Sequence, residues 1–138
     1  MIKLWLSFII FLLLSGCGSD ERIEVVESCN IESPLNVAEL PSNKDFKIVG
    51  WALDNQTLTV PEKISIEFYG NDRKTFAATR LRRPDIVSSF KSNNVEMAGF
   101  EVHVPANSLT TGQYELVIEQ ETPLHKIKCV KGHAININ

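Results

Sequence analysis

Short runs in which apolar and polar residues alternate are the feature that most constrains the fold of this chain. Residues 63–70, KISIEFYG, place Ile64, Ile66 and Phe68 at every second position. A period of two is typical of β-strands with one buried face, and no long helical period follows residue 16. Three later segments repeat the pattern and predict the inward residues Phe100, Val102, Val104, Tyr114, Leu116, Ile118, Ile127 and Cys129.

Turn residues separate these runs. Residues 30–45 contain two prolines and predict a loop, 55–57 predict a turn, and the Gly-Asn-Asp of 70–72 predicts a hairpin. Residues 46–54, FKIVGWALD, are apolar on both faces and predict a central strand, and residues 74–82 predict one strand ending in a basic stretch. Pro84 begins one short helical segment, 84–90. We expect an all-β, antiparallel β-sandwich of seven or eight strands.

The N-terminus predicts export. An apolar run, 4–14, follows Lys3 and is shorter than the roughly 20 residues of a membrane-spanning helix. The next residues, Leu14-Ser15-Gly16-Cys17, resemble the lipobox of bacterial lipoproteins. That resemblance implies cleavage after Gly16 and a diacylglyceryl group on the Cys17 thiol. A plain signal peptide with an incidental cysteine is the alternative.

The domain boundaries and the location follow from that lipobox. We expect a signal peptide over 1–16, a lipidated cysteine with an acidic tether over 17–28, and the sandwich over 29–138. Gly18 stands where an Asp resembles an inner-membrane retention signal. The protein is therefore expected to be a lipid-anchored component of the cell envelope, in the outer membrane and facing the periplasm or the cell surface.

Two cysteines remain after lipidation, Cys29 and Cys129. Export places them in an oxidising compartment, where disulfides persist. We expect a bridge from the first strand to the last, with a free pair as the alternative. Closing a loop of about 100 residues contributes roughly 4–5 kcal/mol in the chain-entropy model. No ligand spacing for a metal occurs among the cysteines and histidines, and we expect no cofactor.

Charges are unevenly spread along the chain. Residues 20–45 are rich in acids, whereas 73–91 carry six basic residues against Asp85. The basic segment is either a solvated face or a patch for an anionic partner such as lipopolysaccharide or a capsule. Nucleic acid is not expected as the partner of an exported protein. We expect His103, His125 and His133 to lie on the surface.

Two further resemblances concern the fold. Leu109-x-x-Gly112-x-Tyr114 resembles the tyrosine corner of immunoglobulin-like sandwiches, in which the Tyr hydroxyl bonds backbone a few residues upstream. No cysteine follows two residues later, where Leu116 stands. The blocks GWALD (50–54), RPDIVSSF (83–90) and AGFEV (98–102) resemble bacterial immunoglobulin-like accessory domains of envelope proteins. Ile86 departs mildly from the Val of that pattern. This resemblance implies an immunoglobulin-like fold, and it makes a carbohydrate-related role at the cell surface a candidate function.

Four residues are candidates for a site. Asp54, Arg83 and Asp85 form either a polar recognition site or a structural clamp, in which Asp85 near a helix start is neutralised by Arg83. Trp51 is either a platform for stacking a sugar or, because its strand is so apolar, a plug of the core.

The function we infer is a non-enzymatic immunoglobulin-like module, anchored in the membrane, that binds an envelope protein or a glycan. The alternative is a small inhibitor or phage-exclusion lipoprotein that inserts residues 82–96 into its target. A glycan-active enzyme is less favoured, because the sequence has no G-x-S-x-G, no H-E-x-x-H and no phosphate-binding glycine loop.

Overall fold

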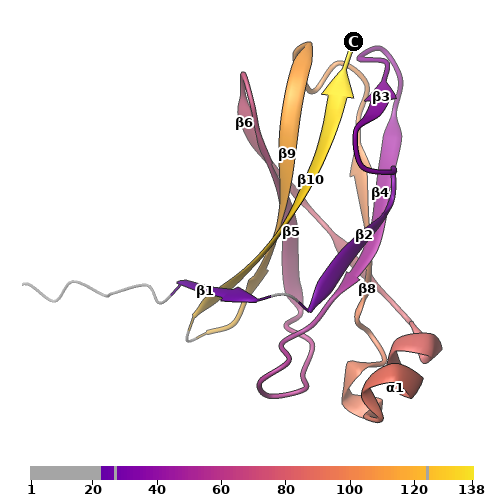
Figure 1. Cartoon of the computed structure of the whole chain (residues 1–138), viewed down its shortest axis with the longest axis vertical. Coiled ribbons are helices and arrows are strands. Elements are labelled where there is room, and N and C mark those ends of the chain that lie inside the picture. Colours follow the sequence, from indigo (N-terminus) through magenta and orange to yellow (C-terminus); the bar gives the residue numbers. More distant parts are fainter. Residues whose placement is uncertain (1–22, 27, 124) are drawn as a thin grey trace, which may run out of the picture.

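Two β-sheets face each other in the computed structural model, which describes residues 23–26, 28–123 and 125–138 (Figure 1). The described residues form ten strands, one α-helix and one 3₁₀ helix. Their bounds are β1 Ile23–Val26, β2 Cys29–Ser33, β3 Ala38–Leu40, β4 Phe46–Ala52, β5 Lys63–Tyr69, β6 Arg73–Ala77, β7 Thr79–Leu81, α1 Pro84–Phe90, η1 Asn93–Val95, β8 Gly99–Val104, β9 Gly112–Glu121 and β10 Lys126–Ile137. The prediction of an all-β sandwich is confirmed.

The larger sheet has the strand order β1-β10-β9-β5-β6, with β3 also paired to β10, and the smaller has the order β2-β4-β8-β7. Most pairs are antiparallel, but β1 and β3 both run parallel to β10. The prediction of a wholly antiparallel fold with seven or eight strands is therefore wrong at this edge. The chain leaves the smaller sheet after β2 and joins the larger sheet at β3, which pairs with β10.

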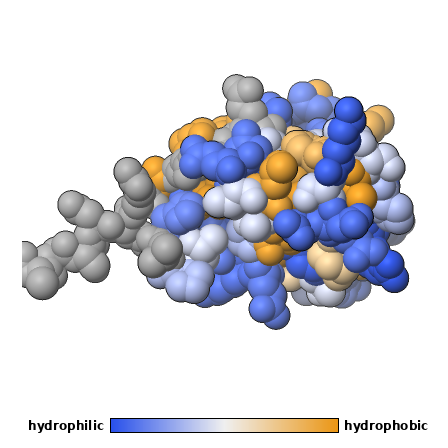
Figure 2. Space-filling model, turned by 90° about the horizontal axis from the view of Figure 1, so that it is seen from below, coloured by the Kyte–Doolittle hydropathy of each residue, from blue (hydrophilic) through white to orange (hydrophobic). Residues whose placement is uncertain are grey.

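The core lies between the sheets, and the predicted inward residues fill it. Ile66, Phe68, Phe100 and Tyr114 are fully buried, and Ile118 is nearly so. A smaller apolar cluster forms beneath α1 from Leu53, Ile86, Val95 and Ala98. The molecular surface at the end that carries α1 is mostly hydrophilic, with apolar residues between the polar ones (Figure 2). The alternation in sequence thus sorts side chains between core and solvent, as expected for half-buried strands.

Several local predictions are confirmed. Strand β4 lies between β2 and β8, as expected for residues 46–54, the hairpin turn at 70–72 joins β5 to β6, and α1 begins at Pro84. The single strand predicted over 74–82 is wrong, because β6 and β7 belong to different sheets. The amide of Ala78, between them, donates to the carbonyl of Ile64 at 2.9 Å. No glycine or proline marks this change of sheet, so the sequence carried no turn signal there.

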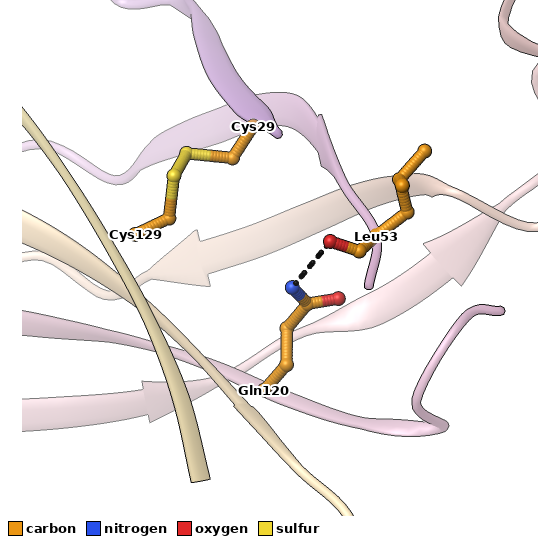
Figure 3. The surroundings of a disulfide bond; sticks show 4 residues. All are labelled: Cys29, Leu53, Gln120 and Cys129. Atoms are coloured by element: carbon orange, nitrogen blue, oxygen red, sulfur yellow. Dashed lines mark hydrogen bonds between the residues drawn. A yellow bond between two sulfur atoms is a disulfide. The ribbon is translucent and has the colours of Figure 1, made fainter. Parts of the chain in front are cut away.

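A disulfide joins the two sheets. Cys29 in β2 and Cys129 in β10 have Cα atoms 6.3 Å apart, are 100 residues apart in sequence, and are both buried (Figure 3). The expected bridge is present, but it joins the last strand to the second strand and not to the first. The reason is that residues 23–26, which were expected to belong to the tether, form the additional strand β1. The predicted signal peptide and Cys17 lie outside the described residues. Within the described residues, no helix is long and apolar enough to span a bilayer.

The contact expected of a tyrosine corner is present. Tyr114 begins the buried stretch of β9, and its hydroxyl donates to the carbonyl oxygen of Thr110 at 3.0 Å. Its ring packs edge-on against Phe68, with centroids 6.1 Å apart. Gly112, with φ of +145°, supplies the turn conformation that other residues resist. The hydroxyl therefore ties the entry into β9 to the preceding turn.

Candidate functional site

Helix α1 and the turn η1 form a projection at one end of the sandwich, between β7 and β8 (Figure 1). Pro84 occupies the first turn of α1, where its missing N–H is no loss, and Asp85 complements the positive end of the helix dipole. The two ends of the projection are joined, because the amide of Arg83 donates to the carbonyl of Glu96 at 2.7 Å. Segment 83–96 is therefore a closed unit rather than a loose loop.

Arg83 connects this projection to the sandwich through an ion-pair cluster, here termed the α1 clamp and made of Glu32, Arg83 and Asp85. Its guanidinium donates to both Asp85 carboxylate oxygens, at 2.8 and 2.7 Å, and to both Glu32 oxygens, at 2.8 and 3.0 Å. The bond from Arg83 lowers the pKa of Asp85 to about 2, and the two carboxylates, Asp85 first, raise the pKa of Arg83. Glu32, on β2, was not among the predicted site residues.

Asp54 does not join this clamp. It is buried, with 4% of its surface exposed, and its Oδ1 accepts hydrogen bonds from the amides of Gln56 at 2.9 Å and Thr57 at 3.4 Å. Its own backbone pairs with that of Thr59. Asp54 thus orders the turn that follows β4, while the structure brings together only Arg83 and Asp85 of the three expected polar residues.

Trp51 is half-buried and packs against the small cluster beneath α1 rather than within the main core. Its ring meets Phe90 of α1 edge-on, with centroids 6.0 Å apart and planes inclined at 67°. Such edge-to-face pairs contribute beyond their buried area. Trp51 therefore holds α1 against β4, and part of its surface stays exposed.

Arg80, one of the six basic residues of segment 73–91, connects the sheets. Its guanidinium donates to the carbonyls of Pro61, Ala52 and Ala98 and, at 2.8 Å, to the side-chain oxygen of Gln120. The fully buried Gln120 donates in turn to Leu53 O at 3.3 Å, close to the disulfide (Figure 3). Burial lowers the pKa of Arg80 to about 10. We call Arg80, Gln120 and the Cys29–Cys129 disulfide the inter-sheet cross-link.

A second polar cluster lies on the outer face of the larger sheet. Glu67 is buried, with 6% of its surface exposed, and bonds Tyr69 and, at 3.2 Å, Arg73. The side-chain hydrogen bond with Glu119, the largest cause, lowers the pKa of Glu67 to about 2, and the same bond raises the pKa of Glu119. Lys128 lies 3.7 Å from both carboxylates. The carboxyl groups of Glu67 and Glu119 are therefore stabilised by the hydrogen bond between them and by the neighbouring cations Arg73 and Lys128.

The histidines occupy three different environments. His103 is exposed and its Nε2 lies 3.1 Å from Asp45, while His125 bonds Thr122. His133 is buried, with 8% exposed, and its Nε2 lies 2.9 Å from the carbonyl oxygen of Pro34. The prediction that all three are surface residues is wrong for His133, because the turn after β2 covers it, and this burial lowers its pKa. Among the described residues no cluster of acids, histidines and cysteines could hold a metal ion.

Comparison with known proteins gives a fold and no family. No family model matches the chain, and no curated protein matches it. The structure is similar to part of the X-ray structure of the endo-β-1,4-mannanase from Thermotoga petrophila, with a TM-score of 0.52 and 12% sequence identity. The match covers 82% of this chain and 20% of the mannanase chain, so this chain spans about a fifth of that protein. At this identity the likeness concerns the fold alone.

Proposed function

We propose that this protein is a non-enzymatic envelope lipoprotein, anchored through Cys17, whose immunoglobulin-like module binds a protein or glycan partner with its α1 end. The observation that carries the proposal is the projection at 83–96, a closed and rigidly attached unit with exposed apolar side chains at its base. Support for the anchor, the fold type and the binding surface comes from separate features.

The anchor is supported by the cysteines. Cys29 and Cys129 are bonded to each other, which agrees with an oxidising compartment. Cys17 is then the one cysteine of the chain left for lipid, within the sequence that resembles a lipobox. Two or three acyl chains anchor a protein stably, because each buried methylene contributes about 0.8 kcal/mol.

The immunoglobulin-like assignment is supported by strand order. In such sandwiches one sheet has the order A-B-E-D and the other contains G-F-C. With β2, β4, β5, β7, β8, β9 and β10 as strands A to G, this chain reads A-B-E-D in its smaller sheet and G-F-C in its larger one. The hydroxyl contact of Tyr114 at the start of the F strand agrees with this assignment.

The α1 end is supported as the binding surface by its rigidity and its exposed apolar groups. Leu81 and Met97, 38% and 41% exposed, stand where the chain enters and leaves the projection. Trp51 lies half-buried beneath it, and the α1 clamp fixes its position. A preorganised surface with apolar anchors and a polar rim suits binding, because little conformational entropy is lost.

The inhibitor alternative uses the same projection. Residues 82–96 form α1 and η1 and extend beyond the end of both sheets (Figure 1). A compact projection could enter the cleft of a target enzyme or receptor. Unchanged lysozyme activity with excess protein, together with unaltered phage adsorption on expressing cells, would remove this alternative.

Two experiments test the proposal. Cys17→Ser should abolish palmitate labelling and release the protein from membranes, and unaltered labelling would contradict the anchor. For binding, cross-linking in intact cells followed by mass spectrometry should give a partner adduct that Leu81→Asp with Met97→Asp removes. The matched control, Thr75→Asp with Ala77→Asp on exposed β6, should keep the adduct. Equal adducts from both double variants would exclude the α1 end.

A further inference from the structure

Exposed apolar side chains gather along one edge of this molecule. Of the seven large hydrophobic residues that are exposed in the described part of the chain, four lie on β1 and on the turn after β2, which flank the edge of β10 that faces away from β9, and a fifth, Val130, lies on β10 itself. We call this set the β10 edge stripe: Ile23 (55% exposed), Val25 (68%), Leu35 (76%), Val37 (60%) and Val130 (44%). Apolar groups gathered in this way mark an interaction surface.

The backbone beneath the stripe is fixed. Strand β1 pairs with residues 126–129 of β10 and β3 pairs with 135–137, both on the edge away from β9. Between them, the turn after β2 is bonded to β10, with the Val37 amide 2.7 Å from Ala134 O and the Ala134 amide 2.8 Å from Asn36 Oδ1. This edge of β10 is therefore covered by segments of the chain itself, and the exposed side chains of the stripe are held on ordered backbone.

The backbone at Val37 also indicates that exposure here is imposed by the fold. Val37 has φ of +59°, a left-handed conformation that a β-branched residue rarely adopts. Its neighbour Leu35 is the most exposed of the large hydrophobic residues described. A strained turn that holds two aliphatic side chains in solvent is an outlier from which a binding role can be inferred.

The position of the stripe identifies its occupant. Six residue steps separate Cys17 from Ile23, the first residue of β1. A fully extended chain of this length reaches about 20 Å at most. If Cys17 carries the lipid, as the proposed function requires, the start of the stripe stays within that distance of the bilayer. We propose that the β10 edge stripe lies against the bilayer in which the protein is anchored, with its aliphatic side chains in the headgroup region.

Charge favours apolar contact over attraction to anionic lipid. Two of the three lysines of β10 are paired, with Lys126 at 3.8 Å from Glu119 and Lys128 at 3.7 Å from both Glu119 and Glu67, and the third, Lys131, is exposed beside Val130. The tether of residues 18–28 is itself acidic, with four acids, at 20, 21, 24 and 27, against Arg22. The contact should therefore form on zwitterionic lipid and should persist at high salt, unlike binding by a basic patch.

Fluorescence quenching by brominated lipid tests the proposal with the full, lipidated chain. Trp51 is the one tryptophan after the signal sequence, so Trp51→Phe gives a silent background. Val25→Trp and Leu35→Trp report on the stripe, and Thr75→Trp, exposed on β6 at the opposite edge of the same sheet, is the matched control. Each variant is placed in phosphatidylcholine vesicles and in vesicles that also contain phosphatidylglycerol.

We expect stronger quenching at positions 25 and 35 than at 75 in both kinds of vesicle. Adding Leu35→Asp and Val37→Asp to the position-25 reporter should lower the ratio of docked to undocked protein by roughly tenfold, because two apolar contacts are lost. Thr75→Asp with Ala77→Asp should leave that ratio unchanged.

Other results would overturn the proposal in distinct ways. Equal quenching at all three positions, with the protein still in the vesicle fraction, removes the docked stripe and leaves the lipid anchor intact. Quenching confined to vesicles with phosphatidylglycerol replaces apolar contact by charge attraction. Cross-links between copies through these positions, without quenching, assign the stripe to a second copy. Protein absent from the vesicle fraction removes the anchor, and the inference falls with it.

Discussion

Arg80 and Arg83 are three residues apart in one basic run, yet they stabilise the molecule in opposite ways. Arg80 belongs to the inter-sheet cross-link, and its partly buried guanidinium donates to neutral carbonyl and amide oxygens. Arg83 belongs to the α1 clamp, and its charge meets two carboxylates near the surface. Burial lowers the pKa of Arg80 to about 10, whereas the carboxylates raise that of Arg83.

The stability of the sandwich and the positioning of α1 therefore depend on different residues. Removing a buried donor leaves several buried acceptors without partners, and each such loss costs about 1–3 kcal/mol. Ion pairs at the surface are screened by water and contribute about 1 kcal/mol or less. The cross-link should therefore set the free energy of unfolding, while the clamp should set the position of α1.

The largest effect should follow loss of the disulfide. Replacing Cys29 and Cys129 together by Ala should lower the free energy of unfolding by about 4–5 kcal/mol, since the bridge closes a loop of 100 residues. Urea denaturation of the variant and of the parent protein measures the difference. A loss below about 1 kcal/mol would show that the non-covalent contacts hold the sheets together without it.

Arg80→Met should have the next largest effect, a loss of about 3 kcal/mol, because the oxygens of Ala52, Pro61, Ala98 and Gln120 lose the hydrogen bonds from its guanidinium. The Ala98 oxygen keeps the bond from the Ala52 amide. Arg80→Lys should recover only part of it, since a single ammonium cannot reproduce the fork. The same urea titration applies to both variants. If the Arg80→Met variant were as stable as the parent protein, the Arg80 guanidinium would not stabilise the fold. The proposed difference between Arg80 and Arg83 would then be wrong.

Arg83→Gln should lower the free energy of unfolding by only about 0.5–1 kcal/mol, because its partners are partly exposed. The amides of α1 should nevertheless exchange hydrogen faster, since the helix loses its tie to β2. Hydrogen exchange followed by NMR measures this, with Arg82→Gln as the control, because Arg82 pairs only with Glu96 among the described residues. Unchanged exchange in α1 would leave the clamp without a positioning role.

The smallest effect should be a local response to acid. The bond from Arg83 lowers the pKa of Asp85 from 3.8 to about 2. A carboxyl with a depressed pKa contributes stability that is present above its unfolded pKa and is lost as pH falls through its folded value. The α1 amide shifts should therefore titrate near pH 2, and NMR across the acid range measures their midpoint. A midpoint near 3.8 would mean that Asp85 is unpaired in solution.

Parts of the site could be predicted from the sequence, because they depend on residues that are close together along the chain. Pro84 and Asp85 lie where a helix favours them, and Tyr114 lies at a fixed offset from Gly112. The roles of Glu32 and Arg80 could not be predicted, because their hydrogen-bond partners lie 51 and up to 40 residues away in sequence. His133 was misjudged because the turn that covers it comes from the other end of the domain.

The sequence by itself determined which side of each strand faces the core, because a period of two sends alternate side chains to opposite faces whatever the partner strand. Only the tertiary structure decided that the chain changes sheet at Ala78, that β10 accepts two parallel strands, and that Arg80 bonds neutral oxygens while Arg83 bonds two carboxylates. The environment of a charge is set by groups that arrive from distant segments, and no local pattern encodes their arrival.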